Sequence, residues 1–341
     1  MNKLILVTGG TGYIGSHTAV ELIEKGFEVV IIDNLSNSTV EVLDGIQKIT
    51  GIRPAFEQFD LCDRGALDTF FRKYSGLAAV IHFAAFKAVG ESVEKPLDYY
   101  ENNLLSLINL LRAMKKYAVP NLVFSSSCTV YGQPDHLPVT ESAPVKKAMS
   151  PYGNTKQISE EILEDTLHAH PSLKAISLRY FNPIGAHPSG LIGELPIGTP
   201  ANLVPFITQV AAGVREELKV YGNDYPTPDG TAIRDYINVV DLSRAHVVAI
   251  GRLLDCRQKA NFEVFNLGTG KGYSVLELIH AFEKATGVKV KYSVVSRRPG
   301  DIEQVWAETG YANAELGWKA SVSLEDTLRS AWNWEMTYRK R

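Results

Sequence analysis

The segment from Ser150 to Lys156 places a lysine four residues after a tyrosine, and no other tyrosine in the chain is followed by a lysine at this spacing. Ser150 is a favourable N-cap and Pro151 a favourable first helical residue, so Tyr152 and Lys156 are predicted to lie one turn apart on one helix face. A tyrosine acts as a base only when its anion is stabilised, and lowering its pKa from ~10 to ~7 requires about 4 kcal/mol. The Lys156 ammonium is a candidate source of that stabilisation. The spacing alone is weak evidence, because roughly one such pair is expected by chance.

Three consecutive serines, Ser125 to Ser127, end an apolar run that predicts a strand. Ligands bind at the carboxyl ends of strands in open parallel sheets. The Ser127 hydroxyl is therefore a candidate to hold a substrate hydroxyl or to relay its proton, although a serine hydroxyl often bonds only its local backbone. Cys128, next to it, is interpreted as a small buried thiol rather than a nucleophile.

A glycine turn follows the first apolar run, with Gly9, Gly12 and Gly15 spaced by three residues. It opens a predicted helix that runs to about Lys25 and stops at Gly26. Such a turn allows the backbone to approach a pyrophosphate and packs the helix tightly on the strand. The helix N-terminus then directs unpaired N–H groups and a positive dipole end toward the phosphates. A plain turn between a strand and a helix is the alternative.

The next apolar run ends in Asp33, 18 residues after Gly15. A carboxylate at this place can hold both hydroxyls of an adenosine ribose, and it would repel a 2′-phosphate. The combination of strand, glycine turn, helix and spaced aspartate therefore predicts NAD, in preference to NADP. Its cationic nicotinamide ring would then add to Lys156 in stabilising a phenolate at Tyr152.

Short apolar runs alternate with amphipathic segments through the first half of the chain. Most of these runs are apolar throughout, as in parallel strands that are buried on both faces. We expect strands at residues 4–8, 28–32, 55–59 (weaker), 78–83, 122–125 and 175–179. Residues 103–117 repeat apolar side chains every three or four positions, which predicts a helix with one buried stripe. Strands alternating with helices predict an α/β protein with a doubly wound parallel sheet, the Rossmann arrangement that binds dinucleotides.

The second half is less regular, with Gly- and Pro-rich loops predicted at residues 186–200 and 222–230. Helices are predicted at 203–214, 241–254, 275–285 and 324–338, and strands at 264–267 and 288–294. Because 341 residues exceed one core of roughly 250 residues, we expect two domains. Residues 1–181 are assigned to an NAD-binding domain and 182–341 to a smaller α/β substrate domain, with later segments allowed to return to the first.

Composition excludes several other classes of function. The formal net charge of −3 argues against a nucleic-acid surface, and no run approaches the ~18 apolar residues of a membrane span. The three cysteines form no CxxC pair and the eight histidines no metal-binding spacing, so neither a disulfide framework nor a metal site is expected. A cytoplasmic protein is the expectation.

The sequence resembles the extended short-chain dehydrogenase/reductase family nearly from end to end, and within it the UDP-glucose 4-epimerases. The motifs that carry the resemblance are TGGTGYIGSHT, DNLSNS, IHFAAFKAVGESVEKPLDYYENN, FSSSCTVYG, SPYGNTK, LRYFNPIGAHPSG, GNDYPTPDGTAIRDYI, FNLGTG and RRPGD. The resemblance implies bound NAD, a UDP-sugar substrate and inversion at carbon four of the sugar through a 4-keto intermediate. It also implies a homodimer built on the helical faces of Leu104, Leu107 and Leu111 and of Ile158 and Ile162.

Residue roles follow from the same resemblance. Tyr152 would be the base on the sugar 4′-hydroxyl, Lys156 would lower its pKa and bind the nicotinamide ribose, and Ser127 would bond the same hydroxyl. The implied cofactor shell is Gly9, Gly12, Tyr13, Ile14, Gly15, Asp33, Asn34, Leu35, Ser36, Asn37, Ser38, Asp60, Leu61, Phe83, Ala84, Ala85, Phe86, Lys87, Asn102, Ser127, Tyr152, Lys156 and Phe181. The implied sugar-nucleotide shell is Ser127, Tyr152, Asn182, Asn202, Leu203, Tyr221, Arg234, Tyr236, Arg298, Asp301 and Val305. Two arginines on polar loops, Arg234 and Arg298, would suit a diphosphate because each offers a planar fork of donors.

One departure from the family bears on specificity. A tyrosine commonly stands before the tryptophan that matches Trp306, where it walls the sugar 2-substituent, but here the residue is Val305. We expect either that the smaller side chain admits N-acetylated UDP-sugars or that neighbouring side chains fill the space.

Two rival functions remain at this point. A sugar-nucleotide 4,6-dehydratase of the same family carries an Asp–Glu pair where this chain has Cys128 and Thr129. A non-enzymatic dinucleotide-sensing regulator would typically have lost the tyrosine or the lysine, and both are present.

Overall fold

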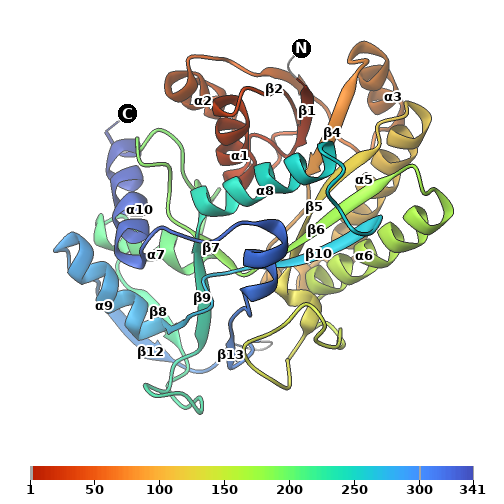
Figure 1. Ribbon diagram of the computed structural model, residues 1–341. Helices are drawn as coiled ribbons and strands as arrows, with labels where there is room; N and C mark the ends of the chain where they lie inside the picture. Colours follow the sequence, from red (N-terminus) through yellow and green to blue (C-terminus); the bar gives the residue numbers. More distant parts are fainter. Residues whose placement is uncertain (1–2, 299–300, 341) are drawn as a thin grey trace.

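The computed structural model describes residues 3–298 and 301–340. Its centre is a seven-stranded parallel sheet in the order β10-β6-β5-β4-β1-β2-β3 (Figure 1). The strands are β1 (Leu4–Thr8), β2 (Glu28–Asp33), β3 (Ala55–Gln58), β4 (Leu77–His82), β5 (Asn121–Ser127), β6 (Lys174–Tyr180) and β10 (Phe262–Leu267). The chain builds outward in one direction from β1 and in the other from β4, so the carboxyl ends of β1 and β4 form the switch point where such sheets bind ligands.

Helices cover both faces of this sheet, and the two cores follow the alternation of side chains along each strand. In β1, for example, Ile5 and Val7 belong to one hydrophobic cluster and Leu6 to the other. The first cluster is closed by α1 (Tyr13–Glu24), α2 (Val42–Thr50) and α8 (Val239–Leu254). The second is closed by α3 (Arg64–Lys73), α5 (Pro96–Lys116) and α6 (Pro151–Ala169). This is the doubly wound α/β fold that the sequence predicts.

A smaller second lobe contains two further sheets. Strand β9 (Ile233–Asn238) pairs with β11 (Gly272–Ser274), β13 (Gln304–Val305) and β7 (Asn182–Ile184), and β8 (Leu218–Tyr221) pairs with β12 (Tyr292–Val295). Helices α7 (Leu203–Ala211), α9 (Val275–Thr286) and α10 (Leu324–Tyr338) pack with these strands around a third hydrophobic cluster. The remaining short elements are α4 (Val89–Glu94), the 3-10 turn η1 (Cys128–Tyr131) and the π-helical turn η2 (Ala312–Leu316).

Several predicted bounds differ from the structure. Helix α5 begins at Pro96, seven residues before the predicted start, because Pro96 suits the first helical position. Strand β12 begins at Tyr292 rather than at residue 288. The Val290 N–H donates to the Glu283 side chain of α9, which withdraws that part of the backbone from the sheet.

The chain returns to the large sheet after it has entered the second lobe. The predicted strand at 264–267 is part of β10, which pairs with β6, and α8 packs against α1. Both elements lie beyond residue 181, so each lobe contains segments from the second half of the chain. The proposed boundary near residue 181 therefore marks where the chain first leaves the large sheet.

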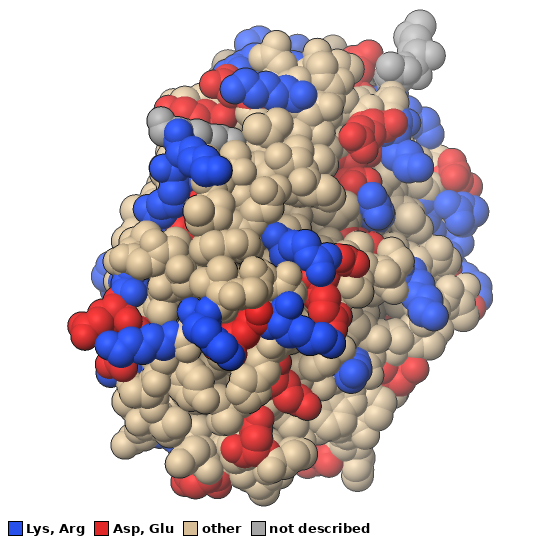
Figure 2. Space-filling view, turned by 90° about the vertical axis from the view of Figure 1, so that its left-hand side faces the viewer, with Lys and Arg blue, Asp and Glu red and all other residues tan. Residues whose placement is uncertain are grey.

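Charged side chains of both signs are interspersed on the face of the molecule in Figure 2, and no basic patch stands out there. Among the described residues, no helix is long and apolar enough to cross a membrane. No group of three or more His, Cys, Asp or Glu side chains within residues 3–298 and 301–340 could hold a metal ion.

Candidate active site

The glycine turn lies at the switch point and has room for no side chain at two of its positions. Gly9 adopts a φ of +69°, and a Cβ atom there would lie 2.8 Å from the backbone nitrogen of Ala84. A Cβ atom at Gly15 would lie 2.3 Å from the Gly9 carbonyl oxygen. Helix α1 begins after Gly12 without a side-chain cap, so the first N–H groups of the helix remain available to an anion. The turn therefore fits the pyrophosphate of a dinucleotide.

Asp33 lies at the carboxyl end of β2, beside this turn. Its Oδ2 accepts a hydrogen bond from the Thr11 N–H at 3.2 Å, and its Oδ1 accepts one from the Leu35 N–H at 2.9 Å. The Ser38 hydroxyl donates to the same carboxylate. These bonds fix the carboxylate at the end of the strand next to the glycine turn, where it suits an adenosine ribose.

The loop after β4, which contains the predicted cofactor residues Phe83 to Lys87, is held by a residue that sequence reasoning missed. Asn103 accepts a hydrogen bond from the Phe86 N–H at 2.8 Å and donates to the Phe86 carbonyl at 3.0 Å and to the Thr155 hydroxyl at 3.1 Å. Asn102, which was predicted, donates its amide to the Asn103 side chain. Asn103 falls on the buried side of the α5 stripe, where a polar residue is a signal for such a tie.

Two further predicted cofactor residues lie at the ends of neighbouring strands. The Asn34 amide donates to the Asp60 carboxylate at 2.9 Å, and the same carboxylate accepts from the Cys62 N–H at 2.7 Å. Leu61 is buried in the core between them and α5. The loops after β2 and β3 are thereby joined at the edge of the sheet.

Tyr152 and Lys156 lie on α6 as predicted. The Ser150 side chain caps the helix by accepting from the Gly153 N–H at 3.1 Å. The Lys156 Nζ atom is 5.9 Å from the centre of the Tyr152 ring and donates to the Ser125 carbonyl at 2.7 Å. The lysine therefore bridges the helix to the serines that end β5.

The protein groups around Tyr152 act on its pKa in opposing directions. Burial raises it to about 12, a hydrogen bond from Ser127 works in the opposite direction, and Cys128 adds to the rise. Burial also lowers the pKa of Lys156 to about 8, against the influence of Glu160. The protein's own groups thus keep the phenol protonated, because desolvation outweighs the stabilisation that a lysine bonded elsewhere can give. A further positive charge, such as that of the nicotinamide ring, is needed to make Tyr152 a base.

Tyr180, at the end of β6, is a second residue that sequence reasoning did not identify. Its hydroxyl is hydrogen-bonded to the Ser125 side chain, and it lies close enough to Tyr152 for the two phenols to interact electrostatically. Ser125 thus contacts Tyr180 through its side chain and Lys156 through its carbonyl. The strand ends β5 and β6 carry more of the site than the sequence indicated.

A buried ion pair lies behind these residues. Glu160, one turn after Lys156 on α6, accepts from the Arg179 Nη2 atom at 2.6 Å, and both side chains are 8% exposed. The same carboxylate accepts from the hydroxyls of Ser126 on β5 and Ser177 on β6. Glu160 therefore fixes the helix that carries Tyr152 to the two strands beside it.

The predicted sugar-nucleotide residues lie mainly in the second lobe. Asn182 in β7 pairs with Tyr236 in β9, and Phe181 is buried directly before β7. Asn202 is the N-cap residue of α7, and Leu203 is the first residue of that helix. Phe181 and Asn182 thus lie where the chain passes from β6 into the second lobe, and Asn202 and Leu203 lie at the start of α7.

Arg234 was predicted to lie on a loop. The structure places it instead in the four-stranded sheet of the second lobe. It is part of β9, and its guanidinium donates to the carbonyls of Ile233 and Ile302, each at 2.8 Å. Residue 234 falls in a strand because it pairs with Tyr273 of β11 and with Val305 of β13. The arginine thereby holds the segment before β13.

Arg298 and Asp301 form an ion pair with Nη2 and Oδ1 2.8 Å apart, and the guanidinium lies 5.7 Å from the centre of the Tyr221 ring. Pro299 and Gly300 of the same motif lie outside the described residues. Arg234 is close enough to Cys128 and to Tyr236 to influence their pKa values. The predicted arginines thus extend from the end of β5, next to Tyr152, toward Tyr221.

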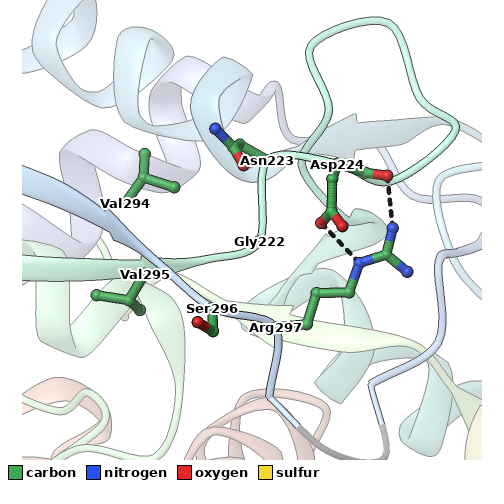
Figure 3. A pocket seen from close by; sticks show the side chains of 7 residues that line it. All are labelled: Gly222, Asn223, Asp224, Val294, Val295, Ser296 and Arg297. Carbon is green, nitrogen blue, oxygen red and sulfur yellow. Dashed lines mark hydrogen bonds and ion pairs between the residues drawn. The ribbon is translucent and has the colours of Figure 1, made fainter.

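A hollow adjoins Tyr221 at the carboxyl ends of β8 and β12 (Figure 3). One side is closed by Arg297, whose guanidinium bonds both the side chain and the carbonyl of Asp224 and lies 4.0 Å from the centre of the Tyr225 ring. The valines Val294 and Val295 flank the other side. The hollow is next to the predicted residue Tyr221, but none of the predicted sugar-nucleotide residues lines it.

Val305 is buried, with 2% of its surface exposed. In β13 it stands opposite Arg234, and its side chain packs in a small cluster with Phe181 and Val130. Its place is therefore beside the predicted diphosphate residues and the residue that follows β6.

The pKa of Cys128 is raised to about 12, mainly by burial, which keeps the thiol protonated and agrees with its interpretation as a small buried side chain.

Comparisons with known proteins agree with this geometry. A family model described as GDP-mannose 4,6 dehydratase matches residues 6–331. The chain is 52% identical to the UDP-glucose 4-epimerase of Bacillus subtilis (strain 168) over 97% of this chain and 96% of the relative. It is 50% identical to the UDP-glucose 4-epimerase of Homo sapiens over 98% of this chain and 97% of the relative. A crystal structure of UDP-glucose 4-epimerase from Bifidobacterium longum in complex with NAD+ and UDP has a TM-score of 0.95 and 47% identity, covering 99% of both chains.

Proposed function

The chain belongs to the UDP-glucose 4-epimerase family of NAD-dependent epimerases and dehydratases, and we propose that its site interconverts UDP-galactose and UDP-glucose. The observation that carries the proposal is the position of Tyr152, which contacts Ser127 at the end of β5 and lies one turn before Lys156. The glycine turn and Asp33 stand at the same edge of the sheet, so a dinucleotide and a sugar can meet at this tyrosine.

The reaction has a physical logic that these residues can serve. Direct inversion of carbon four would break an unactivated C–H bond and form a very basic carbanion. Oxidation avoids this, because removal of the hydroxyl proton by Tyr152 accompanies departure of the hydrogen with its electron pair from carbon four. NAD, when bound, accepts that hydride and returns it to the opposite face of the 4-keto sugar. Tyr152 returns the proton, so the protein ends in the state in which it began.

The protein residues divide the remaining work. The glycine turn and the first turn of α1 are suited to the pyrophosphate, and Asp33 to the adenosine ribose. Lys156 is suited to the nicotinamide ribose and to holding α6 against β5 through the Ser125 carbonyl. Arg234 and Arg298 would bind the diphosphate of the sugar nucleotide, and Tyr221 would lie beside its nucleobase.

The dehydratase alternative lacks its acid and base. The pKa of Cys128 is raised to about 12, and the hydroxyl of Thr129, its neighbour, is buried without a hydrogen-bond partner. Neither side chain can remove and deliver the protons that elimination of water requires.

Incubation of the NAD-loaded protein with UDP-galactose, followed by chromatography and mass spectrometry, distinguishes an epimerase from a dehydratase. UDP-glucose is the expected product, a keto-deoxy sugar would indicate a dehydratase, and no conversion would overturn both readings.

We propose in addition that the site accepts N-acetylated UDP-sugars. The small Val305 side chain beside Arg234 leaves less bulk near the sugar than the tyrosine common in the family, although the Phe181 cluster competes for that space. Val305→Tyr is expected to lower kcat/KM for UDP-N-acetylgalactosamine about tenfold or more while UDP-galactose changes little, since steric overlap in a packed site costs ~1–3 kcal/mol. Steady-state kinetics on both substrates measure this. Failure of the unaltered protein to convert N-acetylated sugars would contradict the proposal.

A homodimer built on α5 and α6 is also proposed, on a face that keeps Leu104, Ile158 and Ile162 of the predicted one. Leu107 and Leu111 are buried within the chain, whereas Leu104, Ile108 and Ile158 are partly exposed and Leu97 is 77% exposed. Removing these apolar surfaces from water would stabilise a dimer. Light scattering is expected to give twice the chain mass for the unaltered protein and the mass of one chain for Ile108→Glu. A single-chain mass for the unaltered protein would exclude the dimer.

A further inference from the structure

One segment of the chain crosses from the large sheet's helices to α10, and we name residues 185–194 the crossing segment. At its start, the Tyr13 hydroxyl of α1 donates to the Gly185 carbonyl at 2.6 Å. At its end, the Trp334 indole N–H of α10 donates to the Glu194 carbonyl at 3.0 Å. A Cβ atom at Gly193 would lie 2.4 Å from the Trp334 ring, so the backbone passes directly against the indole. The segment is therefore fixed at both ends, one in each lobe.

The side chain at the end of this segment connects two predicted ligand-binding residues. The Glu194 Oε1 atom lies 3.0 Å from the Lys87 Nζ atom and accepts from the Asn202 amide at 2.6 Å. Lys87 belongs to the loop after β4, which is part of the cofactor shell, and Asn202 begins α7 in the sugar-nucleotide shell. The Glu194 side chain is only 11% exposed, so its carboxylate is largely shielded from water.

The Asn202 side chain bonds Glu194 in place of the usual hydrogen bond to its own helix. Asparagine at an N-cap usually accepts a hydrogen bond from the first turn of its helix. Asn202 makes no such bond, and its amide is directed to Glu194 instead. The N-cap residue of α7 thus links the helix to the carboxylate.

We propose that Glu194 is a positioning residue that holds Lys87 and Asn202 together and so keeps the two lobes closed around the oxidised sugar. This inference rests on the proposed epimerase function. In that reaction the 4-keto sugar has to turn over before it is reduced, and during this time nothing covalent retains it. A closed contact between the lobes retains the ketone, whereas an open one releases it and leaves the cofactor reduced.

The experiment compares Glu194→Gln with the unaltered holoenzyme and with Glu283→Gln. The glutamine keeps an oxygen for Asn202 but removes the charge that pairs with Lys87. Glu283 is a matched control, because its carboxylate is similarly shielded, pairs with Lys289 at 2.8 Å and lies on α9. Calorimetry measures UDP affinity of each holoenzyme, and near-ultraviolet absorbance measures reduced nicotinamide that accumulates during turnover of UDP-galactose. Thermal unfolding checks that the variants fold.

The expected result for Glu194→Gln is a UDP affinity about fivefold weaker and about fivefold more reduced nicotinamide, the factor that a partly exposed ion pair can contribute. Glu283→Gln should match the unaltered protein in both. Unchanged affinity and no accumulation would overturn the inference, as would tighter UDP binding, which would mean that the carboxylate competes with the ligand. Should the unaltered protein fail to convert UDP-galactose, the proposed function fails instead, and the two failures are thus distinguishable.

Discussion

Replacing Tyr152 by phenylalanine is expected to lower kcat with UDP-galactose by about 10³-fold, within the range that general acid–base groups contribute. The substitution removes the hydroxyl that is proposed to take the proton from the sugar, while keeping the ring that packs at the start of α6. UDP affinity and thermal stability should therefore stay close to those of the unaltered protein. Stopped assays for UDP-glucose measure kcat, and calorimetry measures the affinity. A rate near that of the unaltered protein would remove Tyr152 from the mechanism.

Tyr74→Phe is the matched control, since it removes a phenol that bonds Glu57 at 2.8 Å on the edge of the sheet. Its kcat should not change.

The same Tyr152 variant also locates the pKa of the phenol. The ultraviolet titration of the cofactor-free protein minus that of Tyr152→Phe is expected to show a phenolate that forms near pH 12, since burial raises this pKa. The stability that this shift contributes is present below pH ~10, the pKa of an unfolded tyrosine, and is lost as the pH rises toward 12.

Replacing Arg179 by methionine is expected to destabilise the protein by about 3–5 kcal/mol, because Glu160 would stay buried as an uncompensated charge. That is a large share of the ~5–15 kcal/mol that stabilises a typical domain. The variant should also lower kcat, since Glu160 holds the helix of Tyr152 and Lys156 to Ser126 and its strand. Denaturant unfolding measures the free energy, and kcat is measured well below the unfolding transition.

Arg252→Met provides the comparison, because Arg252 and Glu263 form a second buried pair, 2.7 Å apart and each 5% exposed, between α8 and β10. It should lose similar stability but no more activity than its folded fraction explains. The double variant Glu160→Met/Arg179→Met should unfold at higher denaturant than Arg179→Met alone, because no unpaired charge remains. Equal losses of kcat in Arg179→Met and Arg252→Met would show that the first pair has no positioning role.

The sequence predicted the parts of the site that depend on local order along the chain. The glycine turn could be predicted because Gly9 and Gly15 allow backbone contacts that any side chain would block. Asp33 could be predicted because it ends the next strand. The relative position of Tyr152 and Lys156 could be predicted because helix geometry alone places residues four apart on one face. Most residues of the two ligand shells came from the resemblance rather than from such rules, and their individual roles stay predictions.

The tertiary structure decided everything that depends on pairing across large separations in sequence. The pKa of Tyr152 depends on burial, which no local pattern measures and which raises it to about 12 among the protein's own groups. Arg234 belongs to a strand because the distant strands β11 and β13 pair with it, and Glu194 reaches Lys87 across 107 positions. Helix and turn preferences act over a few residues, so a single sequence reveals them. Desolvation and ion pairing depend on which distant groups the fold brings together, so only the folded chain could supply them.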